Sequence, residues 1–193
     1  MNEIIAITGM CGSGKTTAAN VLKQHGYKYI RFGQVVMDEL LKNHIPINEK
    51  NERATREKLR KDYGMEAFAI LNQPKIDSFV LNSSIVIDGL YSFAEYKLLK
   101  QKYQDKLFNL AIYSPPNTRY KRLENRKASL NDKKVLFRPL TQIEAQERDY
   151  NEIEKSDKGG PIAIADWTIL NNNSLKVFEE EIKEFLHGRR KIQ

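Results

Sequence analysis

The feature that most constrains this chain is a segment at residues 9–17 that fits the pattern G-x-x-x-x-G-K-[ST]. An apolar run rich in β-branched residues precedes it at residues 3–8, which is typical of a buried parallel strand. Residues 17–25 follow with helical propensity, and Gly26 is a suitable helix stop. A strand, a glycine-rich loop and a helix in this order favour phosphate binding over an accidental glycine-rich turn.

The chemistry of this loop is specific to phosphate oxygens. Its glycines admit backbone conformations that a Cβ forbids, so backbone N–H groups and the following helix N-terminus converge on an anion. Lys15 is expected to reach the β- and γ-phosphates of a nucleotide, Thr16 to ligate Mg²⁺, and Thr17 to support the loop. The residues expected to bind the nucleotide are Gly9, Met10, Cys11, Gly12, Ser13, Gly14, Lys15, Thr16 and Thr17.

Composition narrows the class of protein. A length of 193 residues suits one domain with a sizeable core, and 40% hydrophobic with 30% charged residues describe an ordinary soluble globule. No apolar run is long enough to span a membrane, and we expect no signal peptide because the first strand is expected from residue 3. The single cysteine excludes an internal disulfide, so we expect a cytoplasmic protein.

The net charge of +7 has two interpretations. It fits binding to nucleic acid, and it fits polyanionic small substrates equally well. The basic tail at residues 187–191 is a candidate nucleic-acid contact, although a frayed and solvated terminus is the favoured interpretation.

Strands and helices alternate along the rest of the chain. Further strands are expected at residues 27–32, 85–87, 107–113 and 166–171. Helices are expected at residues 34–42, 49–82 with breaks or kinks at Gly64 and Pro74, 92–103 with a capping box at Ser92, 118–127, 142–155 with a break at residues 158–161, and from Ser174 onward. This alternation predicts a parallel sheet with helices on both faces. The helices between the second and third strands are too long for a plain crossover and should protrude over the site.

Asp88 lies at the carboxyl end of the third expected strand, where open parallel sheets bind their ligands. A carboxylate beside a phosphate loop fits the second partner of Mg²⁺, directly or through water. The alternative is that Asp88 merely starts a turn with Gly89. The phosphate loop upstream favours the metal-binding role.

Three arginines fall at i, i+3 and i+7 of the helix expected at residues 118–127, namely Arg119, Arg122 and Arg126. Arginines on one face beside a phosphate site suit a transferring phosphoryl group, and a solvated basic face is an equal alternative. Residues 128–141 lack periodicity but carry basic residues, so they are a candidate for a closing lid.

Together these segments resemble the kinases of the nucleoside monophosphate kinase and dephospho-CoA kinase group. The likeness covers nearly the whole chain and is closest to a little-characterised, mainly archaeal family of adenylate/cytidylate-kinase-like proteins. Besides the loop, it rests on Phe32-Gly33-Gln34-Val35-Val36, Val86-Ile87-Asp88-Gly89, Ser114-Pro115-Pro116-Asn117-Thr118-Arg119, Glu147-Arg148-Asp149 and Ala165-Asp166-Trp167-Thr168-Ile169-Leu170-Asn171.

The resemblance implies an α/β P-loop NTPase fold in three layers, with a five-stranded parallel sheet of order 2-3-1-4-5. It implies a single domain over residues 1–193, with an acceptor-binding helical insert near 33–82 and a lid near 127–147. ATP and Mg²⁺ would be the cofactors, with Thr16 and Asp88 as metal ligands. By position, the catalytic residues would be Lys15, Asp88, Arg122 and Arg126, the acceptor would contact Gly33, Asp88 and Gly89, and the adenine would lie near Asn171.

The chain departs from this group at two positions. Arginines of the group stand where this chain has Met37 and Tyr91, and neither side chain can grip an acceptor phosphate bidentately. The sequence therefore predicts ATP-dependent phosphoryl transfer to a small nucleotide-like acceptor, a nucleoside monophosphate or dephospho-CoA. The alternatives are an ATP-binding switch that transfers no phosphate, and a kinase directed at nucleic acid, which is disfavoured.

Two further residues carry side hypotheses. Cys11 lies where positive potential favours a thiolate, so its oxidation would block ATP binding, whereas a small filler residue is the favoured interpretation. Trp167, the single tryptophan, is interpreted as a packing residue rather than a platform for a base.

Overall fold

A computed structural model describes residues 2–126 and 139–192 of the chain. Its strands are β1 (Ile4–Thr8), β2 (Lys28–Arg31), β3 (Ile85–Asp88), β4 (Leu107–Tyr113) and β5 (Trp167–Leu170). Its α-helices are α1 (Lys15–Gln24), α2 (Gln34–Lys42), α3 (Glu49–Tyr63), α4 (Ala67–Val80), α5 (Phe93–Tyr103), α6 (Pro116–Glu124), α7 (Gln142–Ser156), α8 (Gly159–Ala163) and α9 (Leu175–Ile192). In these ranges no helix has both the length and the apolar character that a bilayer crossing requires.

The five strands form one parallel sheet in the order β2-β3-β1-β4-β5, which confirms the expected topology. β1 lies at the centre between β3 and β4, and every one of its residues is buried. Parallel strands have their carboxyl ends at a common edge, so the loops that follow the strands gather there. This edge positions the candidate site.

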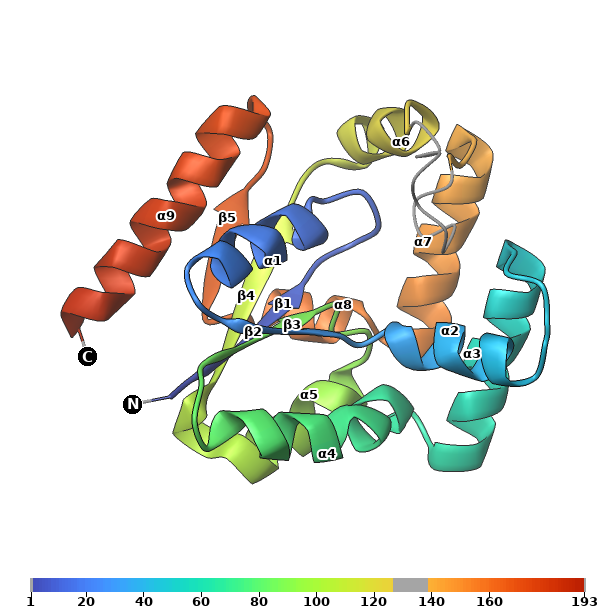
Figure 1. The fold of residues 1–193 in the computed structure, drawn as a ribbon. Coiled ribbons are helices and arrows are strands. Elements are labelled where there is room, and N and C mark those ends of the chain that lie inside the picture. Colours follow the sequence, from blue (N-terminus) through green and yellow to red (C-terminus); the bar gives the residue numbers. More distant parts are fainter. Residues whose placement is uncertain (1, 127–138, 193) are drawn as a thin grey trace.

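Successive residues of β1 contribute to opposite sides of the core, as the two-residue period of a strand requires. Ile4 and Ala6 pack with residues of α2, α4 and α5, whereas Ile5 and Ile7 pack with residues of α1 and α9. Figure 1 shows these layers, with α1 and α9 on one face of the sheet and α4 and α5 on the other. The expected three-layer arrangement is confirmed.

The insert between β2 and β3 consists of α2, α3 and α4. Asn48 caps α3 by accepting a hydrogen bond from the backbone N–H of Asn51 at 2.9 Å, and the helix ends before Gly64, whose φ is 80°. The expected break at Gly64 is therefore confirmed. Pro74 lies inside α4 without ending it, because the burial of Phe68 and Ile76 offsets the single hydrogen bond that a proline removes.

Two boundaries near the carboxyl edge differ from expectation. α6 begins at Pro116, where a proline sacrifices no hydrogen bond, and it ends at Glu124. Arg126 therefore lies beyond the helix, and the expected row of three arginines on one helical face is wrong. The Gly-Gly-Pro segment, expected only as a break, forms the short α8, and the carbonyl oxygen of Pro161 accepts from Asn109 of β4 at 2.7 Å.

The C-terminal tail does not fray as expected. α9 continues to residue 192, and Arg189 donates to the Glu3 carboxylate at 2.5 Å while its guanidinium lies 3.6 Å from the ring centroid of Phe108. This ion pair and cation–π contact hold the tail against the sheet. Trp167 is 56% exposed, and its ring centroid lies 6.4 Å from that of Phe185, so it packs against α9.

The expected N-terminal cap of α5 is present, and it buries a carboxylate. Ser92 Oγ accepts from the backbone N–H of Glu95 at 3.1 Å, and Glu95 Oε2 accepts from the N–H groups of Ser92 and Tyr91. Glu95 is fully buried, and this burial raises its pKa to about 7 despite the hydrogen bonds and the charge of Arg60, which lower it.

We expect Glu95 to make the protein less stable as pH rises from about 4.3 to about 7. In that window the folded state binds the carboxyl proton more tightly than the unfolded state, so folding is favoured at the acidic end. Glu95→Gln should reduce the difference in unfolding free energy between pH 5 and pH 7.5, measured in urea, by on the order of 2 kcal/mol. Glu144→Gln, in the exposed capping box of α7, should not; an unchanged pH dependence in Glu95→Gln would contradict the assignment.

Candidate active site

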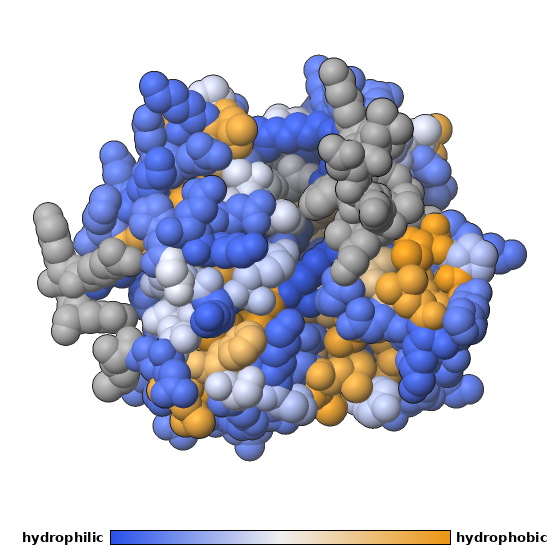
Figure 2. Space-filling model, viewed as in Figure 1, coloured by the Kyte–Doolittle hydropathy of each residue, from blue (hydrophilic) through white to orange (hydrophobic). Residues whose placement is uncertain are grey.

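A cavity of about 520 Å³ lies at the carboxyl edge of the sheet. Figure 2 shows this face hollowed near its centre, with hydrophilic residues visible in the hollow. The charged residues that line the cavity are Lys15, Arg31, Glu52, Arg56, Asp88, Arg122, Arg126, Arg148 and Lys158. Cations outnumber acids in this set, so the cavity is suited to a polyanion.

The phosphate loop, residues 9–17, has the backbone conformation for which glycines were expected. Gly9, Gly12 and Gly14 have φ angles of 142°, 80° and 107°, a region that residues with a Cβ rarely adopt. A Cβ on Gly9 would collide with the carbonyl oxygen of Ile112, and a Cβ on Gly14 with the side-chain amide of Asn171. Neighbouring elements thus fix the shape of the loop.

We expect Gly14→Ala to lower ATP affinity at least tenfold, as measured by calorimetry. The methyl group would displace Asn171, whose Nδ2 donates to the carbonyl oxygen of Ser13 at 2.8 Å, and would strain the backbone by roughly 1–3 kcal/mol. Gly26→Ala is the matched control, because its φ is 96° but no atom lies within 4 Å of the added Cβ. That variant should lose stability and keep its ATP affinity. Equal ATP affinities in the two variants would show that the collision with Asn171 is unimportant.

Lys15 begins α1 and faces the cavity from the loop. Its Nζ donates to the carbonyl oxygen of Met10 at 3.0 Å, which folds the side chain back across the loop. Burial, and secondarily the positive charge of Lys158, lower the pKa of Lys15 to about 8. A bound polyanion would favour the charged amine, so the site is complementary to phosphate oxygens.

Asp88 ends β3 beside the loop, and its Oδ2 accepts from Thr16 Oγ1 at 2.9 Å and from the Tyr29 hydroxyl at 2.8 Å. The two expected metal ligands, Thr16 and Asp88, are therefore in contact. A hydroxyl and a carboxylate beside a phosphate loop fit Mg²⁺, which takes oxygen ligands and few of them from protein. Residues 2–126 and 139–192 contain no cluster of three acidic, histidine or cysteine side chains that would hold a metal without phosphate. Tyr29 was not foreseen, because no sequence signal marks it.

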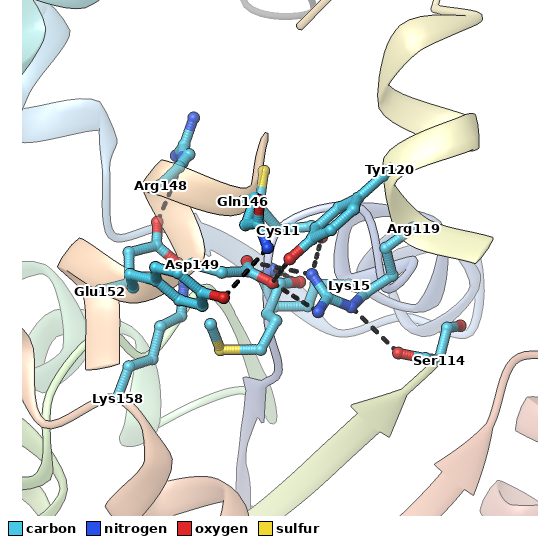
Figure 3. A network of polar contacts seen from close by, with 12 residues as sticks. Cys11, Lys15, Ser114, Arg119, Tyr120, Gln146, Arg148, Asp149, Glu152 and Lys158 are labelled. Atoms are coloured by element: carbon cyan, nitrogen blue, oxygen red, sulfur yellow. Dashed lines mark hydrogen bonds and ion pairs between the residues drawn. The ribbon is translucent and has the colours of Figure 1, made fainter. Parts of the chain in front are cut away.

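Arg119 does not face the cavity, and neither interpretation from sequence holds for it. It is 4% exposed and forms two hydrogen bonds with the Asp149 carboxylate of α7, at 3.0 and 2.6 Å. Its guanidinium also donates to the carbonyl oxygens of Cys11 and Ser114 at 2.9 and 3.0 Å. Figure 3 shows this residue joining the loop, the end of β4 and α7. Its role is to hold these three segments together.

Arg122 and Asn171 form a second link to the loop, and both line the cavity. Arg122 donates to the carbonyl oxygen of Asn171 at 2.9 Å and to Ser114 Oγ at 2.9 Å, while Asn171 donates to Ser13. Arg126 lines the same region from beyond the end of α6. Two of the three arginines expected at the phosphates thus reach the cavity.

Lys158 is a cavity residue that sequence reasoning missed. It is 1% exposed, its Nζ donates to Glu152 Oε2 at 2.5 Å, and it lies 4.9 Å from the ring centroid of Tyr91. Burial raises the pKa of Glu152, but the charges of Lys158 and Arg148 outweigh this effect and hold the pKa below its usual range. Arg148 of α7 and Lys158, which precedes α8, therefore supply cations paired with Glu152 to the cavity (Figure 3).

The end of the cavity beyond Asp88 combines arginines with apolar walls. The walls are formed by Gly33, Val36, Met37, Phe68 and Tyr91, and the arginines are Arg31 and Arg56. Met37 and Tyr91, the two positions at which the resembling kinases have arginines, thus form part of the cavity wall. Neither Arg31 nor Arg56 was foreseen, since a strand end and a charged helix carry no motif.

The remaining expected site residues are placed as follows. Gly89 is not part of the lining, and a Cβ added to it would meet the Tyr91 ring, whereas Gly33 lines the cavity. Cys11 is buried with Leu123, Leu140 and Ala145, as the filler interpretation requires, and it also lines the cavity. Residues 127–138 of the expected lid lie outside the described residues. The other expected residues that line the cavity are Gly12, Gly14, Lys15, Thr16, Thr17, Asp88, Arg122, Arg126 and Asn171.

Comparison with known sequences identifies relatives over nearly the whole chain. A family model described as AAA domain matches residues 5–155. The UPF0200 protein of Thermococcus kodakarensis is 30% identical over 95% of this chain and 96% of its own length. The UPF0200 protein of Pyrococcus horikoshii is 32% identical, with 94% of each chain covered.

Comparison with solved structures supports the fold. A Thermus thermophilus protein named TT1252 superposes with a TM-score of 0.59 at 19% identity, covering 97% of each chain. The shikimate kinase of Acinetobacter baumannii, solved with shikimate, superposes with a TM-score of 0.58 at 16% identity, covering 100% of this chain and 96% of that one. At such identities the likeness concerns the fold alone.

Proposed function

Because the chain belongs to the UPF0200 family and carries an AAA domain, we propose that it is an ATP-dependent phosphotransferase acting on a small nucleotide-like acceptor. One observation carries this proposal. A single cavity runs from the phosphate loop, with Lys15 and the Thr16–Asp88 contact, to a second cationic end at Arg31 and Arg56. A nucleotide-binding switch needs only the first end, whereas a phosphotransferase needs room for two anionic substrates.

In this proposal the insert of α2, α3 and α4 binds the acceptor, and the loop binds ATP. An oxygen of the acceptor forms a bond to the γ-phosphorus, the bond from that phosphorus to the bridging oxygen breaks, and ADP leaves with the electron pair. Lys15, Arg122 and Arg126 stabilise negative charge on the phosphoryl oxygens. Thr16 and Asp88 are suited to hold Mg²⁺, which, when bound, neutralises phosphate charge.

Positioning supplies much of the rate of such a transfer, and the fold provides it. Tyr29 and Thr16 orient the Asp88 carboxylate, while Asn171 fixes the loop through Ser13. The shared fold of the shikimate kinase, which was solved in complex with shikimate, is consistent with this class of reaction.

The deciding experiment measures ADP release from ATP and Mg²⁺ with a panel of acceptors. The panel contains ribo- and deoxyribonucleoside monophosphates and dephospho-CoA, with Lys15→Ala as the blank. One acceptor that raises ADP release well above the blank would support the proposal. Tight ATP binding by calorimetry with no turnover on any acceptor would instead favour a switch, the function that Met37 and Tyr91 suggest from sequence.

A further inference from the structure

Arg31 marks the acceptor end of the cavity. Arg31 ends β2 and is in register with Asp88, which ends the neighbouring strand β3. The next strand in the sheet is β1, and the phosphate loop follows its carboxyl end. Asn171 follows β5 at the opposite side of the loop. A nucleotide whose base lies toward Asn171 therefore directs its terminal phosphate toward Asp88 and Arg31.

One guanidinium nitrogen of Arg31 makes no hydrogen bond to the residues that the structure describes. Its Nη1 is buried and has no hydrogen-bond partner among residues 2–126 and 139–192. The neighbouring arginines differ, because Arg56 contacts Glu52 at 3.4 Å and Arg148 contacts Glu152 at 3.0 Å. An unsatisfied guanidinium nitrogen costs free energy, so its presence at a cavity indicates a ligand that satisfies it.

The walls beside Arg31 favour a particular shape of ligand. The rings of Phe68 and Tyr91 meet edge to face with centroids 5.5 Å apart, and Val36 and Met37 add aliphatic surface. The cavity end therefore offers a cationic fork next to an apolar slot. An anionic group attached to a flat, apolar body matches both features.

The carboxylates at this end are already engaged. Asp88 Oδ2 accepts hydrogen bonds from Thr16 and Tyr29, and Glu52 contacts Arg56. A hydroxyl acceptor benefits from a carboxylate that removes its proton. A phosphomonoester does not, because near neutral pH its oxygens are largely deprotonated. The arrangement thus favours an acceptor whose attacking oxygen belongs to a phosphate.

We infer that Arg31, together with Arg56 of the same cavity lining, binds the phosphate of a phosphomonoester acceptor and takes the place of the arginines absent at Met37 and Tyr91. This inference rests on the proposed function and specifies its acceptor class. An oxygen of the held phosphate bonds to the γ-phosphorus as ADP departs, and the acceptor becomes a diphosphate. No proton is transferred, and the charge of a dianionic acceptor and ATP equals that of the two diphosphate products.

In the test, Mg²⁺ and a β,γ-imido analogue of ATP first occupy the phosphate loop, so that the phosphate group of an added monophosphate cannot bind there. Calorimetry then measures the Kd of AMP, CMP, adenosine and cytidine for the parent protein, Arg31→Gln and Arg31→Lys. Arg53→Gln is the matched control, since Arg53 lies on exposed α3 surface and contacts Glu57. Parallel assays measure phosphoryl transfer from ATP to the same compounds and to dephospho-CoA.

We expect Arg31→Gln to raise the Kd of at least one monophosphate about ten- to a hundredfold, with Arg31→Lys intermediate. Nucleoside binding, ATP-analogue binding and the Arg53→Gln protein should be unaffected. Monophosphate binding that depends on Arg31 without any transfer would support the inference while the proposed function fails. Equal transfer by Arg31→Gln, transfer only to a hydroxyl acceptor, or no binding of any monophosphate would overturn the inference.

Discussion

Lys15→Ala is expected to lower kcat/KM for phosphoryl transfer by roughly a thousandfold or more. The Lys15 amine is the partly buried cation of the loop, and among residues 2–126 and 139–192 its hydrogen bond is to the Met10 carbonyl oxygen. Its removal therefore takes away charge at the phosphates and little of the packing. The melting temperature should stay within a few degrees of the parent value, since a buried charge disappears together with its desolvation cost.

The measurement is initial-rate ADP release with the best acceptor of the panel, together with a thermal melt. Lys23→Ala serves as the control, because Lys23 lies exposed in the last turn of the same helix, with its Nζ over the Tyr29 ring at 5.9 Å. That variant should retain activity. If Lys15→Ala keeps substantial turnover while Lys23→Ala is also active, then the assigned role of Lys15 is wrong.

Asp149→Ala is expected to lower the free energy of unfolding by about 3–5 kcal/mol, the largest effect on stability that we predict. The substitution leaves the Arg119 guanidinium, only 4% exposed, without its carboxylate partner. It also removes the acceptor of the Tyr120 hydroxyl, which donates to Asp149 at 3.0 Å. Denaturation in urea, followed by circular dichroism, measures the loss.

Two companion proteins separate the buried ion pair from a general charge effect. Glu57→Ala breaks the exposed pair with Arg53 and should cost less than about 1 kcal/mol. The double variant Arg119→Met/Asp149→Leu removes both buried charges and should recover part of the stability that Asp149→Ala loses. A loss in Asp149→Ala no larger than that in Glu57→Ala would show that Arg119 is not held by this pair.

The features that the sequence predicted are those with a local signal. The phosphate loop, the strand ending at Asp88 and the capping box at Ser92 each depend on neighbours in the chain, and the structure places them as expected. The sheet order followed from the resemblance and is confirmed. The contact of Thr16 with Asp88 joins two adjacent parallel strands, because Asp88 ends β3 and the loop that follows β1 leads to Thr16 in the first turn of α1.

The features that could not be predicted depend on residues distant in sequence. Arg119 and Asp149 are 30 positions apart, and no periodicity distinguishes a buried ion pair from two surface charges. The same applies to Lys158, whose burial depends on its contacts with Glu152 and Tyr91 and has no signal in the sequence. The Arg31 Nη1, which has no hydrogen-bond partner among the described residues, likewise could not be identified without the three-dimensional structure of the cavity. Tertiary contacts, not propensities, decide these positions.

The junction at Arg119 also limits how the sequence can drift. The Arg119 guanidinium donates hydrogen bonds to Cys11 of the loop, to Ser114 after β4 and to Asp149 of α7. Loss of Arg119 or Asp149 alone therefore leaves the other charge buried without its partner. Descendants can exchange this pair for apolar residues only through an ancestor that folds poorly, or by changing both codons together. We expect lineages of this chain to keep the two residues or to lose them jointly.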